Sequence, residues 1–177
     1  MEGWLGSALI ATLVSSLVTA FGWYVTHRNS RRLEELRRDE KVIDFQTALI
    51  AEINTNIARF SGTKLEVHAR EMRKLILAGR RDYTPFVLRY SGTIVFDEVL
   101  KEIHILPNGV IQDVIAYYKQ EHALQLLADD LRSENFAKLD KQRKADLFVE
   151  FIRNIEGSHK QGELAIAAMR QAIEPRK

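Results

Sequence analysis

The first segment of the chain, Gly3 to Thr26, constrains the fold more than any other stretch. Its 24 residues, GWLGSALIATLVSSLVTAFGWYVT, include no charged side chain. A helix of that length spans roughly 36 Å, which is enough to cross a hydrocarbon core of about 30 Å. We therefore predict a single transmembrane helix that anchors the protein through residues 1–27.

The predicted span has a face of small residues opposite a face of large apolar residues such as Leu9, Ile10 and Leu13. In lipid, small residues allow a second helix to approach closely, and their hydroxyls can bond across the contact. We expect this face to bind another copy of the chain or another membrane protein; the alternative is that small residues are simply tolerated here. The predicted interface consists of Gly3, Ser7, Ala8, Ala11, Thr12, Ser15, Ser16 and Thr19.

The charges that flank the span predict its orientation. Only Glu2 precedes it, whereas a basic cluster follows it: Arg28, Arg31, Arg32, Arg37 and Arg38. The positive-inside rule places this cluster in the cytoplasm and Met1 outside a cytoplasmic (inner) membrane. The arginines set the topology, and they are also expected to contact membrane lipid headgroups. A cleaved signal peptide is the alternative, but the acidic start and the length of the apolar run argue against it.

The remaining charge is balanced. The chain has 177 residues, with 26 Lys and Arg against 24 Asp and Glu. Residues 27–38 hold five Arg and two Glu; once these and Glu2 are set aside, residues 39–177 hold 21 charges of each sign. This balance argues against nucleic acid as a partner. The absence of cysteine excludes disulfides and thiolate chemistry and agrees with a reducing compartment.

A long helix is predicted to continue from the span. Residues 28–60 lack Gly and Pro, and Ile43, Ile50 and Ile57 recur every seven positions. Residues 28–41 are expected to form a basic stalk, and residues 42–177 a cytoplasmic helical domain. A coiled coil is a weaker interpretation because the companion heptad positions include Glu40 and Asn54. The polar run from Glu52 to Asn56 predicts a buried hydrogen-bond network rather than a ligand site.

Breaks and caps divide the rest of the chain into helices. Ser61-Gly62 ends the first helix, and Thr63 with Glu66 matches a capping box for a second helix that ends near Gly79. We expect these two helices to pair antiparallel. The segment after Thr84-Pro85 is either a short helical turn or an extended piece.

Three further helical segments are predicted. A short helix begins near Thr93, and Pro107 to Gly109 separates it from a helix over residues 110–131. Ser133 can cap the following segment. The final segment, with Phe151 in its apolar pattern, is either one helix with a soft middle at Gly157 and Gly162 or two helices. The predicted fold is an all-α bundle.

The order of these segments resembles a loose group of uncharacterised small bacterial single-pass membrane proteins with a cytoplasmic helical domain. The resemblance rests on the uncharged span, the arginine-rich stalk, the run AEINTNI and the run YSGTIVFDEVLKEIHILPNGVIQDVIAYY. It covers residues 3 to 118 and implies a fold but no activity.

No catalytic pattern is present in the sequence. Glu156 and His159 form a single Glu-x-x-His, whereas a di-iron bundle needs two copies and two further Glu. The sequence has no phosphate-binding loop and no nucleophile elbow. We therefore predict no catalytic, cofactor-binding or metal-binding residues, no cofactor and no enzymatic activity.

Two functions remain open. The first is a membrane-anchored interaction or accessory subunit that assembles through its transmembrane helix and helical domain. The alternative is a membrane-linked regulator or effector, such as a phage-defence component, that acts when it is triggered.

Overall fold

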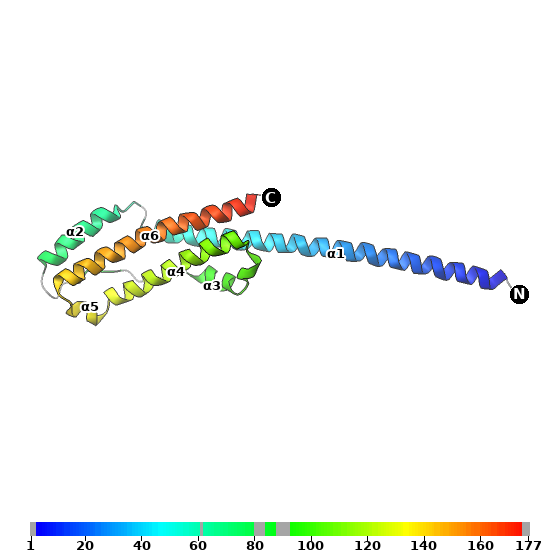
Figure 1. Cartoon of the computed structure of the whole chain (residues 1–177), viewed down its shortest axis with the longest axis horizontal. Helices are drawn as coiled ribbons and strands as arrows, with labels where there is room; N and C mark the ends of the chain where they lie inside the picture. The colour runs from blue at the N-terminus through cyan, green and yellow to red at the C-terminus, as the bar shows by residue number, and fades with distance from the viewer. Residues whose placement is uncertain (1–2, 61, 80–83, 88–92, 175–177) are drawn as a thin grey trace. The chain divides into compact units, whose positions relative to one another are not determined.

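The computed structural model describes residues 3–60, 62–79, 84–87 and 93–174, and it describes side chains from residue 15 onward. These residues form six α-helices and one 3-10 turn, with no strand among them, which confirms the predicted all-α class. In chain order (Figure 1) the elements are α1 Gly3–Ala58, α2 Leu65–Ala78, α3 Ile94–Leu100, η1 Ile103–Ile105, α4 Asn108–Leu131, α5 Glu134–Lys138 and α6 Lys141–Ile173.

The chain divides into two compact units, Met1–Val42 and Ile43–Lys177. The first unit contains the N-terminal part of α1. The second unit is a bundle that contains the C-terminal part of α1 and all the other helices.

The predicted location in a membrane is contradicted. Over the residues that the structure describes, no helix is both long enough and apolar enough to cross a bilayer. The sequence predicted a single-pass inner-membrane protein with Met1 outside and the C-terminal domain in the cytoplasm. This finding contradicts that prediction.

The long helix α6 is the centre of the bundle. It packs extensively against both α4 and α2, and it runs without interruption past Gly157 and Gly162. At Gly162 the three helices α1, α4 and α6 meet: a Cβ atom built on this residue would lie 2.9 Å from Ile57, 3.1 Å from Ile53 and 3.1 Å from Tyr117. The glycine therefore permits close approach of the helices. The expected alternative of two separate helices is wrong.

The predicted antiparallel pairing of α1 with α2 is also wrong, because both helices run along α6, one after the other. Near the end of α1, Ile57 lies against Gly162 of α6. Further along the chain, Arg73 of α2 forms an ion pair with Asp146, and Lys141 Nζ donates to the carbonyl of Leu77. Figure 1 shows α2 beside the N-terminal half of α6. The turn at Gly62, where φ is +82°, thus continues the direction of the chain instead of reversing it.

The predicted helix caps differ in outcome. Ser133 caps α5 as predicted, since its Oγ accepts a 3.1 Å hydrogen bond from the backbone N–H of Phe136. The capping box at Thr63 does not form: α2 begins only at Leu65, and its first turn has no side-chain cap. The backbone of Thr63 is held in the preceding turn by a 3.2 Å bond to the carbonyl of Phe60. Residues 84–87 form no helical turn, and residue 88 lies outside the described residues.

Candidate functional site

The residues of the predicted helix–helix interface all lie on α1. Gly3, Ser7, Ala8, Ala11 and Thr12 belong to the part whose side chains are outside the described residues. Ser15, Ser16 and Thr19 are exposed, and the hydroxyl of Thr19 donates to the carbonyl of Ser15 at 2.8 Å. The hydroxyl of Thr19 is therefore satisfied within its own helix, and the proposed role of the small face stays a prediction.

The large apolar side chains of the same part of α1 are also exposed. Leu17 is 69% exposed and Phe21 is 70% exposed. At about 100° per residue, five of these side chains fall within roughly 120° of the helix circumference. We call this set the apolar stripe; it consists of Leu17, Val18, Phe21, Tyr24 and Val25. Trp23 lies on another side of the helix, where its ring stacks on His27 at 5.4 Å.

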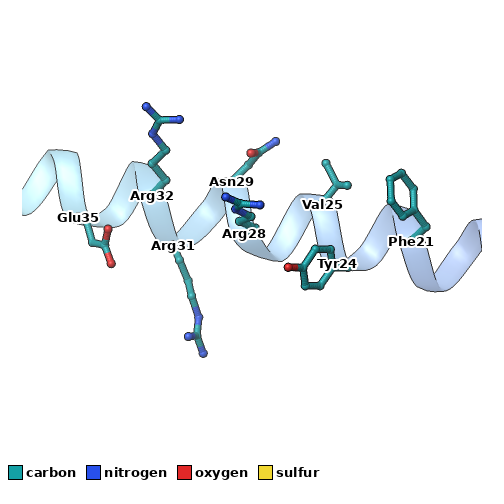
Figure 2. A pocket seen from close by; sticks show the side chains of 8 residues that line it. All are labelled: Phe21, Tyr24, Val25, Arg28, Asn29, Arg31, Arg32 and Glu35. Atoms are coloured by element: carbon teal, nitrogen blue, oxygen red, sulfur yellow. The ribbon is translucent and has the colours of Figure 1, made fainter.

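The apolar stripe leads directly into the arginine cluster. A shallow hollow of about 720 Å³ lies along this part of the helix, and all of its lining residues come from α1. Figure 2 shows their side chains. They are Phe21, Tyr24, Val25, Arg28, Asn29, Arg31, Arg32 and Glu35. One helix alone cannot enclose a ligand, so this surface suits contact with another chain better than binding of a small molecule. Arg37 and Arg38 are exposed further along the helix.

In the bundle, Glu52 of α1 is the centre of a polar contact. Its carboxylate accepts hydrogen bonds from the backbone N–H groups of Val95 (2.7 Å) and Phe96 (3.2 Å) in the first turn of α3. It also accepts a 2.6 Å bond from the hydroxyl of Tyr118 in α4. These bonds confirm the predicted hydrogen-bond network at Glu52. The network joins α1 to α3 and α4.

Tyr118 reinforces the same contact. Its ring stacks on Phe96 with centroids 3.8 Å apart and an interplanar angle of 10°. Burial, together with the hydrogen bond and the negative charge of Glu52, raises the pKa of Tyr118 far above its ordinary range. The phenol therefore remains a neutral donor and does not act as a base.

Two polar pairs join α4 to α6 beside this contact. The hydroxyl of Ser158 donates to Glu121, and both side chains are buried. Gln120 Nε2 donates to Asn154 Oδ1 at 3.1 Å. Because each group is satisfied by its partner, these pairs specify helix packing and leave no open site.

A second hollow, here called the apolar groove, lies where the end of α1, the start of α2 and the middle of α6 come together. Its volume is about 370 Å³. Its lining consists of Arg59, Phe60, Thr63, Leu65, His68, Phe86, Val87, Phe148, Phe151, Ile152 and Ile155. His68 meets Phe148 edge to face, with centroids 6.0 Å apart. Of the described residues that line the groove, Arg59 is the one with a permanently charged side chain.

Within the part of the chain that the structure describes, no three His, Asp or Glu side chains lie close enough together to hold a metal ion. His159 packs against the ring of Phe60 at 6.0 Å, and its Nε2 is buried without a hydrogen-bond partner. Burial lowers the pKa of His159, and the nearby carboxylates of Glu163 and Glu156 partly oppose this effect.

Sequence reasoning did not identify the apolar groove, because it placed Phe148, Phe151 and their neighbours in the core. A residue in the core and a residue in the wall of a groove have the same helical periodicity. The groove becomes evident only once the structure places Thr63, Phe86 and Val87 beside Phe148 and Phe151.

No family model matches the chain, and neither a curated protein nor a solved structure is similar to it. The resemblance to small bacterial membrane proteins stays a prediction.

Proposed function

We propose that this protein is a non-enzymatic assembly subunit that binds a second copy of itself through the N-terminal part of α1. The observation that carries the proposal is the apolar stripe, whose large side chains lie exposed on a single helix. Fully burying one such side chain contributes about 1.5–3 kcal/mol. A second helix against the stripe would therefore provide a substantial free energy of association.

The stripe and the small face are competing interfaces. In lipid the small face favours helix contact, because large apolar side chains gain nothing by leaving the acyl chains. In water the preference reverses, because Phe21 and Leu17 gain free energy by leaving the solvent, while Ser15 and Thr19 lose little by remaining in it. We therefore assign the contact to the stripe.

The charges that follow the stripe favour a second copy of the chain as the partner. Blocks of two like charges alternate in sign: Arg31-Arg32, Glu34-Glu35, Arg37-Arg38 and Asp39-Glu40. A helix that carries both signs in this way can pair with another copy of itself, because a block on one copy can meet a block of opposite sign on the other. Opposite charges at flanking positions help to select the partner.

The test is the oligomeric state of the full chain by sedimentation equilibrium. Phe21→Ser with Tyr24→Ser should weaken association at least tenfold, because both changes remove large apolar area from the stripe. Ser15→Leu is the matched change on the small face and should leave association unchanged. A monomeric wild-type protein, or a loss of association with Ser15→Leu alone, would contradict the assignment.

The charge pattern has its own test. Arg31→Glu with Arg32→Glu should weaken association, because residues 31–35 would then carry a single sign and lose the alternation. Unchanged association would show that the charge blocks do not contribute and would leave the stripe itself to the preceding experiment.

A further inference from the structure

We propose that residues 28–38 of α1, here called the processing segment, are a site at which an arginine-directed endopeptidase separates the apolar stripe from the bundle. Cleavage there would end self-association, so this inference rests on the proposed function. The reaction is a hydrolysis. Water adds across the peptide bond that follows an arginine, so that the arginine gains a carboxylate and the next residue gains an amine.

The processing segment lies in a long exposed stretch of α1. Every residue from Ser15 to Lys41 is exposed, including Leu33 at 55% and Leu36 at 52%. Burial along the helix begins only at Val42, which is 1% exposed. Most helices in proteins depend on the packing of one face for their stability. Because this stretch buries no face, its local unfolding should cost little free energy.

Local unfolding is the step that makes a helix open to a protease, which binds its substrate in an extended conformation. When opening and closing are fast, the rate of cleavage follows the population of the open form. The processing segment can open without loss of the core, because the bundle is a compact unit of its own that begins at Ile43. An open segment presents the bonds after Arg28, Arg31, Arg32, Arg37 and Arg38.

Packing protects the basic residues of the bundle helices. Arg73 of α2 and Arg132 of α4 lie on helices that pack along α6, and Lys144 of α6 is itself buried. Opening of α2 or α4 would expose core side chains such as Ile76 and Leu124. The open forms of these helices are therefore rarer than that of the processing segment.

Self-association and cleavage should oppose each other. A cut in the processing segment leaves the apolar stripe on one product and the bundle on the other. Association in turn should protect the segment, because the charge blocks Arg31-Arg32 and Glu34-Glu35 contribute to the contact between two copies. The protease would therefore process free copies and spare assembled ones.

Limited digestion of the full chain with trypsin, followed by mass spectrometry of the intact products, tests the position of the site. In dilute protein the first cut should fall between Arg28 and Asp39, and the helical circular dichroism of the bundle should persist. A first cut anywhere else in the chain would overturn the proposal.

Glycine variants test the local unfolding. Leu33→Gly with Leu36→Gly should speed the first cut at least tenfold, because glycine has a much lower helix propensity and every arginine is retained. Leu33→Ala with Leu36→Ala is the matched control and should not speed it, since alanine is the best helix former. Equal rates for the two variants would overturn the proposal.

The dependence on protein concentration separates this inference from the proposed function. Where sedimentation shows association, the wild type should be cut at least tenfold more slowly than the variant with Phe21→Ser and Tyr24→Ser. Equal rates would overturn the protection by association, although self-association itself would stand. A wild type that stays monomeric would contradict the proposed function, and the position of its first cut would still decide whether the processing segment is the site.

Discussion

The hydroxyl of Tyr118 donates a 2.6 Å hydrogen bond to Oε2 of Glu52, and this bond joins α4 to α1 across 66 positions of the sequence. The same carboxylate accepts from two backbone N–H groups in the first turn of α3, those of Val95 and Phe96. A carboxylate at the start of a helix also meets the positive end of the helix dipole. One acidic side chain therefore fixes the position of a seven-residue helix that has no side-chain cap of its own.

Removing the phenolic hydroxyl should measure the contribution of this contact. Tyr118→Phe retains the ring and its stacking on Phe96, but it takes one donor from a partly buried carboxylate. Hydrogen bonds to charged groups contribute about 1.5–3 kcal/mol, so we expect a loss of that size in the free energy of unfolding. Urea unfolding monitored by circular dichroism measures it.

Lys101→Ala provides the control, because Lys101 forms an ion pair with Glu98 in which both side chains are largely exposed. Exposed ion pairs contribute at most about 1 kcal/mol, so this variant should lose clearly less stability than Tyr118→Phe. Equal losses would show that the Glu52 contact is no stronger than a surface pair.

Gly162→Ala should destabilise the protein even though alanine favours a helix more than glycine does. The new methyl group would lie 2.9 Å from Ile57 Cδ1 and 3.1 Å from the side chains of Ile53 and Tyr117. Overpacking of this kind costs about 1–3 kcal/mol, which exceeds the gain of about 1 kcal/mol in helix propensity. Thermal unfolding should show a lower Tm.

Gly157→Ala is the matched control in the same helix. Its nearest neighbour would be Gln120 Nε2 at 3.7 Å, an ordinary van der Waals distance. Only the helix propensity changes here, so stability should rise by about 0.5–1 kcal/mol. A higher Tm for both variants would show that the contact of the three helices at Gly162 is loose.

Phe151→Ala should cost about 3–5 kcal/mol, because the side chain is 5% exposed and packs within the main apolar cluster of the bundle. Phe86→Ala is the companion change. The Phe86 ring is 86% exposed, so the free energy of unfolding measured in urea should change by less than about 0.5 kcal/mol. A small effect at Phe151 would place its ring outside the core.

Local patterns in the sequence were enough to predict the helical segments and some of their ends. The cap at Ser133 and the burial of Phe151 depend on neighbours within a turn or two, so periodicity and capping chemistry identify them. The sequence left two alternatives for residues 141–173, one continuous helix or two helices. Glycine has a low helix propensity, and the sequence does not show whether packing compensates for it.

Relations between distant segments could not be predicted. The polar run around Glu52 predicted hydrogen bonds but not their donors, which lie in α3 and α4. A break at Ser61-Gly62 marked the end of α1 without indicating whether the chain turns back or continues along α6. The apolar groove forms where three such segments meet, so no single stretch of sequence predicts it.

The stability of the protein should fall as the pH drops through the range in which histidine titrates. Burial lowers the pKa of His159 below its ordinary value of 6.5, so the unfolded chain binds a proton at a pH where the folded protein does not. The contribution of neutral His159 is therefore complete above about pH 6.5 and is lost as the pH falls towards the lowered pKa. His159→Gln removes the titrating group, so the difference in unfolding free energy between about pH 7.5 and pH 5 should be smaller than in the wild type. The same pH dependence in both proteins would exclude His159 as its source.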